Sequence, residues 1–240
     1  MIDWLLAPID ASRAHDLGAA VSWHGRTMVL VWAVLIPAGV IAARYFKVTP
    51  AQNWPDVLDN PWWWHLHRRT QMLAGVLMLV GLALVLARPA MPASVTAGLW
   101  LHHWLGWSVL ALALSQFTSA LLRGTKGGPT SPAADGSLRG DHFDMTPRRR
   151  LFEYLHKFGG LLAVLLSVPA LTTGLWQANA PVWMWLVLSL WWLWLALCVG
   201  VLEQRVSTLD TYQAIWGPDP ALPGNQRRPI GFRVRRRTGL

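Results

Sequence analysis

Residues 101–122 read LHHWLGWSVLALALSQFTSALL, an apolar run that opens with two adjacent histidines. The run has the length of the roughly 20 apolar residues that a helix needs to cross a bilayer. A histidine inside a bilayer is costly unless something binds it. The pair His102 and His103 therefore raises the question of which one holds a ligand and which one lies at the membrane surface.

Four further runs share the length and composition of the first, and together they predict the fold class. The chain is 53% hydrophobic and only 14% charged, whereas a soluble domain carries about 25% charged residues. Its 17 tryptophans are typical of a protein that meets a bilayer surface. We expect an all-α polytopic membrane protein with five transmembrane helices, the first four of them forming a bundle. The expected helices cover about 18–46, 62–87, 97–123, 151–176 and 181–204.

The segments between these helices divide the chain into three parts. Residues 1–17 form a short extracytoplasmic segment without the features of a signal peptide, and 18–205 form the membrane domain. A polar loop at 124–147 interrupts that domain, and 206–240 form a basic, proline-rich tail. The helix breaks coincide with Pro50 and Pro55, with Pro89 and Pro92, and with Pro181.

Basic residues are distributed unevenly between the two sides. Only Arg13, Arg26 and Arg88 belong to the side of the N-terminus, and the other eighteen of the 21 belong to the opposite side. The positive-inside rule makes that opposite side cytoplasmic. The isoelectric point near 11 therefore reports topology and requires no nucleic acid. The basic tail is expected either to be disordered and solvated or to touch anionic lipid or another subunit.

Six of the eight histidines lie near helix starts. Because consecutive helices run in opposite directions, the first and third helices start on one side and the second and fourth on the other. His24 therefore shares a depth with His102 and His103, whereas His65 and His67 share a depth with His156. Alternate helices of a four-helix bundle are diagonal neighbours across its core, so the sequence predicts two tiers of facing histidines.

Two tiers of facing histidines suit two non-covalent b-type haems. A flat macrocycle between two imidazoles needs small neighbours, and His103-Gly106 and His156-Gly159 share an H-x-x-G spacing. This spacing favours His103 as the ligand, since His102 points about 100° away and is expected at the interface. The glycines expected to pack closely on haem are Gly25, Gly75, Gly106, Gly159 and Gly160.

Cations near each tier are candidates for pairing with haem propionates. Arg26 lies near the first tier, and Arg68, Arg69 and Lys157 lie near the second. The alternative is that these side chains extend to lipid headgroups.

Other metal chemistry is poorly supported. A single cysteine, Cys198, excludes disulfides and iron–sulfur clusters within the chain, and the absence of C-x-x-C-H excludes covalent c-type haem. His142, flanked by Asp141 and Asp144, is expected to belong to a solvated loop.

Four phrases in order, SWHGRTMVLVWAVLIPAGVIAARYFK, WWWHLHRRTQ, LHHWLGW and YLHKFGG, make residues 20–205 resemble the cytochrome b561 family. The likeness is to its bacterial members and to the membrane part of forms with an attached redox sensor domain. The resemblance implies two haem b groups held by four histidines, electron transfer across the membrane, and a place in the bacterial inner membrane. Its motif H-R-x-x-Q matches His67-Arg68 with Gln71, which favours His67 over His65. The implied ligand pairs are His24 with His103 and His67 with His156.

The expected function is therefore electron transfer between a periplasmic or quinol-side partner and a cytoplasmic one. The expected redox partner is a quinol, a c-type cytochrome or another electron carrier. Assembly as a homodimer or with further membrane subunits is a second open question. Many relatives have a sixth helix, and their lysine- and arginine-lined ascorbate sites do not map onto these motifs. One alternative is a haem b anchor subunit that exchanges electrons with quinone. The other is a haem-free scaffold or transporter, which the lack of charged residues in the middle of the spans disfavours.

Overall fold

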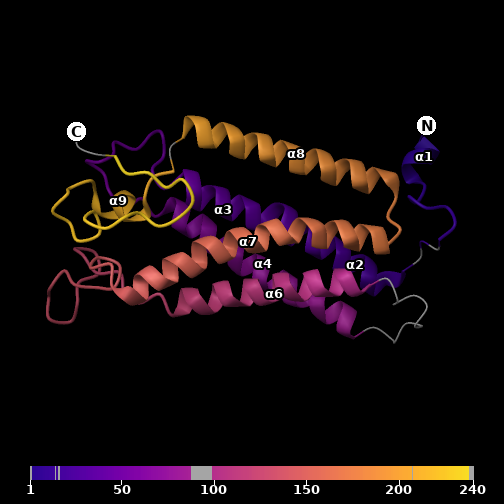
Figure 1. Ribbon diagram of the computed structural model, residues 1–240, viewed down its shortest axis with the longest axis horizontal. Helices are drawn as coiled ribbons and strands as arrows, with labels where there is room; N and C mark the ends of the chain where they lie inside the picture. Colours follow the sequence, from indigo (N-terminus) through magenta and orange to yellow (C-terminus); the bar gives the residue numbers. More distant parts are fainter. Residues whose placement is uncertain (1, 14, 16, 88–98, 207, 238–240) are drawn as a thin grey trace. The chain divides into compact units, whose positions relative to one another are not determined.

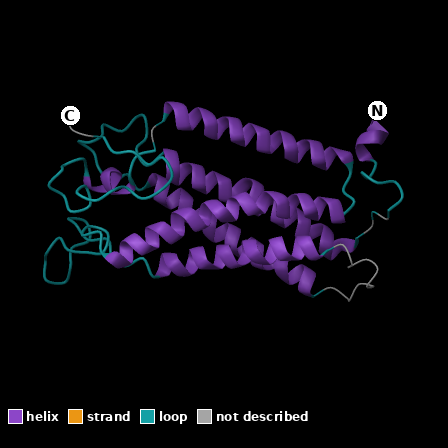
Figure 2. Cartoon of the chain, viewed as in Figure 1, coloured by secondary structure: helices purple, strands orange, loops and turns teal. Residues whose placement is uncertain are grey.

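The computed structural model describes residues 2–13, 15, 17–87, 99–206 and 208–237. Within these ranges the regular structure is helical and contains no extended strand (Figure 2). Five helices are long and apolar enough to cross a membrane, which indicates a multi-pass membrane protein. The predicted fold class is confirmed.

The described helices follow one another along the chain as labelled in Figure 1. In order they are α1 (Ile2–Leu6), α2 (Gly18–Val29), η1 (Leu30–Leu35), α3 (Ile36–Tyr45), α4 (Trp62–Leu86), α6 (Trp100–Leu121), α7 (Pro147–Gln177), α8 (Val182–Arg205) and α9 (Thr211–Trp216). The first membrane helix is continuous through α2, η1 and α3.

Most predicted helix ends agree with these bounds to within two residues, and α7 is the exception. It begins at Pro147, four residues before the expected start at Leu151. Proline suits the first position of a helix, where its missing N–H would have no partner. The expected helix start at Ala97, the break at Pro89–Pro92 and the position of Arg88 lie outside the described residues.

A proline inside the first membrane helix creates the attachment point for the fifth. Pro37 has no N–H to donate to the carbonyl of Ala33, four residues before it, and Ala33 itself lies in the π-helical turn η1. The indole Nε1 of Trp191 on α8 donates to that carbonyl oxygen over 2.7 Å. Because Trp191 itself lies in an apolar helix, this bond gives a specific contact between α8 and the first membrane helix.

The chain forms two compact units. The first comprises Met1–Gly39, Arg69–Ala111 and Ala163–Val201, and the second comprises Val40–Arg68, Leu112–Leu162 and Leu202–Leu240. Each long helix contributes residues to both units. The first unit contains His24, His102 and His103, and the second contains His67 and His156.

The C-terminal segment folds within the second unit. Tyr212, Ile230 and Met145 of the 124–147 loop form a buried cluster, against which Trp216 and Leu222 pack. The expectation of a disordered tail is therefore wrong for the described residues. We call residues 208–237 the C-terminal cap.

Candidate functional site

The first unit holds one pair of facing imidazoles, His24 and His102. Their ring centres are 6.3 Å apart and their planes are nearly perpendicular, at 89°. Nδ1 of His24 lies 2.9 Å from the carbonyl oxygen of Gly81, and Nδ1 of His102 lies 3.1 Å from that of Ala170. A carbonyl oxygen only accepts, so each neutral ring carries its proton on Nδ1 and presents Nε2 as a lone pair.

A cavity of about 1690 Å³ adjoins this pair, and its lining includes His24, His102, His103, Gly25 and Gly106. A Cβ atom built on Gly25 or Gly106 would meet nothing within 4 Å. The cavity is larger than the 300–1,000 Å³ typical of small-molecule pockets. The two glycines therefore leave open space for a large flat ligand beside the histidines.

The second unit holds the other pair, His67 and His156. Their ring centres are 6.1 Å apart, at an interplanar angle of 83°. An aromatic residue one turn earlier accompanies each of them. The Trp64 ring lies 6.5 Å from that of His67, and the Phe152 ring stacks on that of His156 at 5.1 Å. These contacts limit the orientations that the two imidazoles can adopt.

Two arginines that the sequence analysis did not select cover these aromatic rings. The guanidinium of Arg123 lies 4.5 Å from the ring centre of Trp64, and that of Arg149 lies 4.8 Å from the ring centre of Phe152. Burial lowers the pKa of Arg123, and the charges of Arg149 and Arg68 lower it further. Positive charge is therefore concentrated beside the second pair, which would stabilise a bound anion.

The predicted propionate partners Arg26, Arg68 and Arg69 are exposed. Arg26 lies with its guanidinium 5.1 Å from the ring centre of Trp23, its neighbour one turn earlier. Arg68 is close enough to Arg123 for their charges to interact. Because all three side chains are exposed, each could pair with a haem propionate or extend to a lipid headgroup, the two roles considered from the sequence.

Lys157 and Gln71 make specific contacts with the protein itself. The Nζ atom of Lys157 donates to Glu153 Oε2 over 2.6 Å and to the carbonyl oxygen of Ile230 over 2.8 Å. The side-chain amide of Gln71 donates to the carbonyl oxygen of Ile36 over 3.3 Å. Lys157 thus contacts the C-terminal cap, and Gln71 links α4 to the first membrane helix.

The remaining predicted glycines lie on α4 and α7. Gly159 and Gly160 face the side chain of Gln116, which a Cβ on Gly159 would approach to 2.7 Å. Gly75 lies on α4 and is half-buried. Gln116 was not selected from the sequence, since a single glutamine in an apolar run carries no local signal of its contacts.

The other histidines are placed differently from the two pairs. The ring of His103 is 6.2 Å from that of its neighbour His102, and His65 is exposed. Adjacent helical residues point about 100° apart, so His102 and His103 cannot both direct a nitrogen at one metal. Within the described ranges, no group of three or more His, Cys, Asp or Glu residues forms a candidate site for a metal ion.

His142 is buried, contrary to the expectation of a solvated loop. It is only 3% exposed, and its ring lies 5.7 Å from that of Tyr212 and 5.9 Å from that of Trp216. Burial, with a smaller effect of the charge on Arg149, lowers its pKa to about 3. His142 is therefore a neutral core residue of the second unit.

Three curated relatives align with most of the chain. A cytochrome b561, DM13 and DOMON domain-containing protein of Arabidopsis thaliana is 29% identical over 202 residues, which cover 81% of the chain and 19% of that protein. Ferric-chelate reductase 1 of Bos taurus is 28% identical over 174 residues, covering 70% and 24%. The human ferric-chelate reductase 1 is 27% identical over 157 residues, covering 63% and 22%.

The chain is similar to cytochrome b561-type proteins. It spans about a quarter or less of the length of these three relatives. A scan of family models finds no match, and no solved structure matches the chain.

Proposed function

We propose that the chain carries electrons across a membrane through two b-type haems, each held between two histidines. His24 and His102 would hold one haem, and His67 and His156 the other. The likeness to cytochrome b561-type proteins supports this class of activity.

The spacing of the two histidine pairs carries the proposal. An imidazole nitrogen binds a transition metal at about 2.0–2.1 Å, and the ring centre lies about 1.1 Å behind it, so two imidazoles on one metal have centres about 6 Å apart. The observed separations are 6.3 Å and 6.1 Å. The donor set and the open space at Gly25 and Gly106 fit a bis-histidine haem.

The choice of His102 replaces the sequence-based prediction of His103 in this proposal. The ring of His102 lies opposite that of His24, and its Nδ1 is held by the Ala170 carbonyl. A ligand imidazole whose other nitrogen is fixed in this way has a defined tautomer and orientation. His103 is more exposed and lines the cavity, where it would lie beside the ligand.

A haem supplies a one-electron change between ferric and ferrous iron, and two histidine ligands leave no open position for oxygen. The residues of the chain hold and orient the group. The carbonyls of Gly81 and Ala170 direct the Nε2 atoms of the first pair, and Trp64 and Phe152 orient the second pair. The arginines beside the second pair would bind propionates.

The partners and the location are part of the same proposal. The distribution of basic residues favours a cytoplasmic C-terminus and an N-terminus on the opposite side. The resemblance to bacterial members of the family implies the inner membrane, and so a periplasmic N-terminus. A quinol, a c-type cytochrome or another carrier would exchange electrons with the first pair. Bis-histidine sites at two depths would then connect that partner with a cytoplasmic one.

A haem b anchor subunit that exchanges electrons with quinone is the second candidate function. Two properties of the cavity in the first unit favour this candidate. The cavity has a volume of about 1690 Å³, and part of its wall is the apolar surface of Trp194 and Val187 on α8. Co-purification of another membrane subunit would distinguish this candidate from a free-standing carrier.

Absorption spectroscopy of the purified protein tests the proposal. We expect about two haems per chain and a b-type α-band that sharpens on reduction with dithionite. His67→Ala should lose one haem and retain the other, whereas the control His65→Ala should retain both. A colourless protein, or retention of both haems by the His67→Ala variant, would contradict the proposal.

A further inference from the structure

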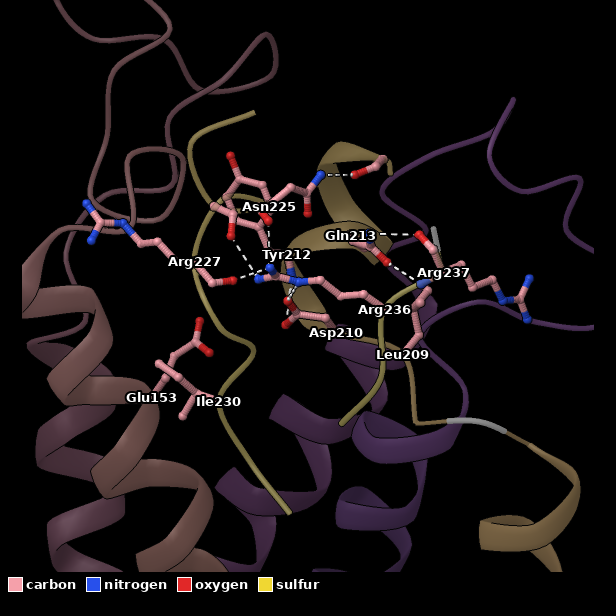
Figure 3. A network of polar contacts seen from close by, with 12 residues as sticks. Glu153, Leu209, Asp210, Tyr212, Gln213, Asn225, Arg227, Ile230, Arg236 and Arg237 are labelled. Carbon is pink, nitrogen blue, oxygen red and sulfur yellow. Dashed lines mark hydrogen bonds and ion pairs between the residues drawn. The ribbon is translucent and has the colours of Figure 1, made fainter. Parts of the chain in front are cut away.

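The C-terminal cap is held together by one guanidinium group. Nε of Arg236 donates to Asp210 Oδ2 over 2.7 Å, and its Nη atoms donate to the carbonyl oxygens of Asn225 and Gly224, each over 2.8 Å. A further bond reaches the carbonyl of Arg227. Figure 3 shows Arg236 lying among Asp210, Asn225 and Arg227. Four acceptors along 210–227 are thereby tied to the end of the cap.

The cap is attached to the helix turn that carries His156. Lys157, the next residue, donates to the cap carbonyl of Ile230 and to Glu153 Oε2. Glu153 is 3% exposed and also accepts from Nε of Arg149 over 3.2 Å. A buried carboxylate is stable only when paired and hydrogen-bonded. Lys157 meets this need for Glu153 and also bonds the cap carbonyl of Ile230, so one side chain links this turn of α7 to the cap.

Two other parts of the second unit bind the cap as well. Arg44 donates to the carbonyl oxygen of Phe232 over 2.8 Å, and Nζ of Lys47 donates to that of Leu209 over 3.1 Å. Tyr212, 1% exposed, donates its hydroxyl to the carbonyl oxygen of Phe143 over 2.8 Å. The cap therefore contacts three segments of the unit that contains His67 and His156.

Two properties of the cap bear on the second histidine pair. It carries six arginines and two aspartates, a net positive charge, and its Ile230 carbonyl is bonded to Lys157 on α7. Lys47, which donates to the cap carbonyl of Leu209, and Glu153, whose partner Lys157 donates to that of Ile230, are both buried, so a folded cap would help to keep water from the turn next to His156. Positive charge and exclusion of water both disfavour the ferric state relative to the less positive ferrous state, and both therefore raise a haem reduction potential.

We propose that Arg236 is a positioning residue, which keeps the cap folded on α7 and thereby raises the reduction potential of the haem between His67 and His156. This inference rests on the proposed function, since it requires a haem at that pair. The C-terminal cap thus affects the reduction potential through its folded structure as well as through its positive charge.

Redox potentiometry of the full-length protein tests the inference. Arg236→Ala should lower the midpoint potential of the His67–His156 haem by about 59 mV or more, a tenfold change in its one-electron reduction equilibrium. The potential of the other haem should not move. His24→Ala, which retains only the second haem, assigns the two potentials. The matched control is Arg228→Ala, which removes the same charge from an exposed position of the cap and should leave both potentials unchanged.

Limited proteolysis provides a readout that does not depend on haem. The cap should become cleavable in Arg236→Ala and stay resistant in Arg228→Ala and in the wild type. If Arg236→Ala does not fold, Asp210→Ala, which removes the carboxylate that accepts from Arg236 Nε, should lower the same potential, whereas the loss of a negative charge alone would raise it.

Equal shifts in Arg236→Ala and Arg228→Ala would show that charge alone acts, and would overturn the role of Arg236. A cleavable cap with an unchanged potential would also overturn it, while the proposed function would survive. A wild-type protein without haem would overturn both.

Discussion

His102 lies with its ring 6.3 Å from that of His24 and with Nδ1 on the Ala170 carbonyl. Its neighbour His103 is more exposed to the cavity. We therefore expect His102→Ala to lose one of two haems, because the iron would lose an oriented ligand. His103→Ala should keep both, as measured by the haem-to-protein ratio and the reduced spectrum.

The reverse outcome, in which only His103→Ala loses a haem, would restore the prediction drawn from the H-x-x-G spacing. Thermal unfolding of the two variants provides the control, since both substitutions place alanine at adjacent positions of α6. Similar unfolding temperatures would show that a difference in haem content arises from ligation.

The open space at Gly106 leads to a second prediction. A Cβ atom there would meet nothing within 4 Å, and the residue lines the cavity of the first unit. Gly106→Leu should place its side chain in that cavity and lower the haem content from two towards one. The protein itself should fold, since glycine in a helix interior costs about 0.5–1 kcal/mol relative to alanine.

Gly200 offers a matched control for this substitution. It also lies in a membrane helix, and a Cβ atom there would likewise meet nothing within 4 Å. Gly200→Leu should retain both haems. Full haem content in Gly106→Leu would mean that the cavity is not where the flat ligand lies.

The bond from Trp191 to the Ala33 carbonyl predicts a specific loss of stability. Trp191→Phe keeps the aromatic packing but removes the side-chain donor to the Ala33 carbonyl. We expect a loss of about 1–3 kcal/mol in the free energy of unfolding, the usual cost of an unsatisfied buried group. Trp194→Phe, at the ring that stacks on Trp191 at 4.9 Å, should cost less. Equal losses would show that packing alone attaches α8.

The buried His142 predicts a pH-dependent stability for the second unit. Burial, followed by the charge of Arg149, lowers its pKa from 6.5 to about 3, while Glu153 acts in the opposite direction. The unfolded chain therefore binds the extra proton first, and stability falls as the pH drops from about 6.5 towards 3. One such group changes the free energy of unfolding by up to about 1.4 kcal/mol per pH unit.

His142→Phe keeps a ring against Tyr212 and Trp216 but cannot be protonated. Its stability, followed by protease resistance of the cap, should decline less over this pH range than that of the wild type. Parallel declines in the two proteins would assign the acid sensitivity to other groups, with Glu153 and Asp141 as the nearest carboxylates to examine.

The membrane helices could be predicted because each is a long apolar run with its own local signal. The proposed choice of His102 over His103 could not, because it rests on a carbonyl of α7 and a ring of α2 that are distant in sequence. The fold of the cap was missed for a related reason. Its composition is basic and rich in proline, and its core joins Tyr212 and Ile230 to Met145, more than sixty residues away.

The helix α8 is apolar around its whole circumference. Burial of apolar surface therefore does not select which side of the helix turns towards its neighbours. A directional bond from Trp191 to Ala33 can make that selection. Most other side chains of α8 should then be interchangeable among aliphatic types. A change of tryptophan position by one residue, however, would move the indole donor by about 100° around the helix axis and away from the Ala33 carbonyl.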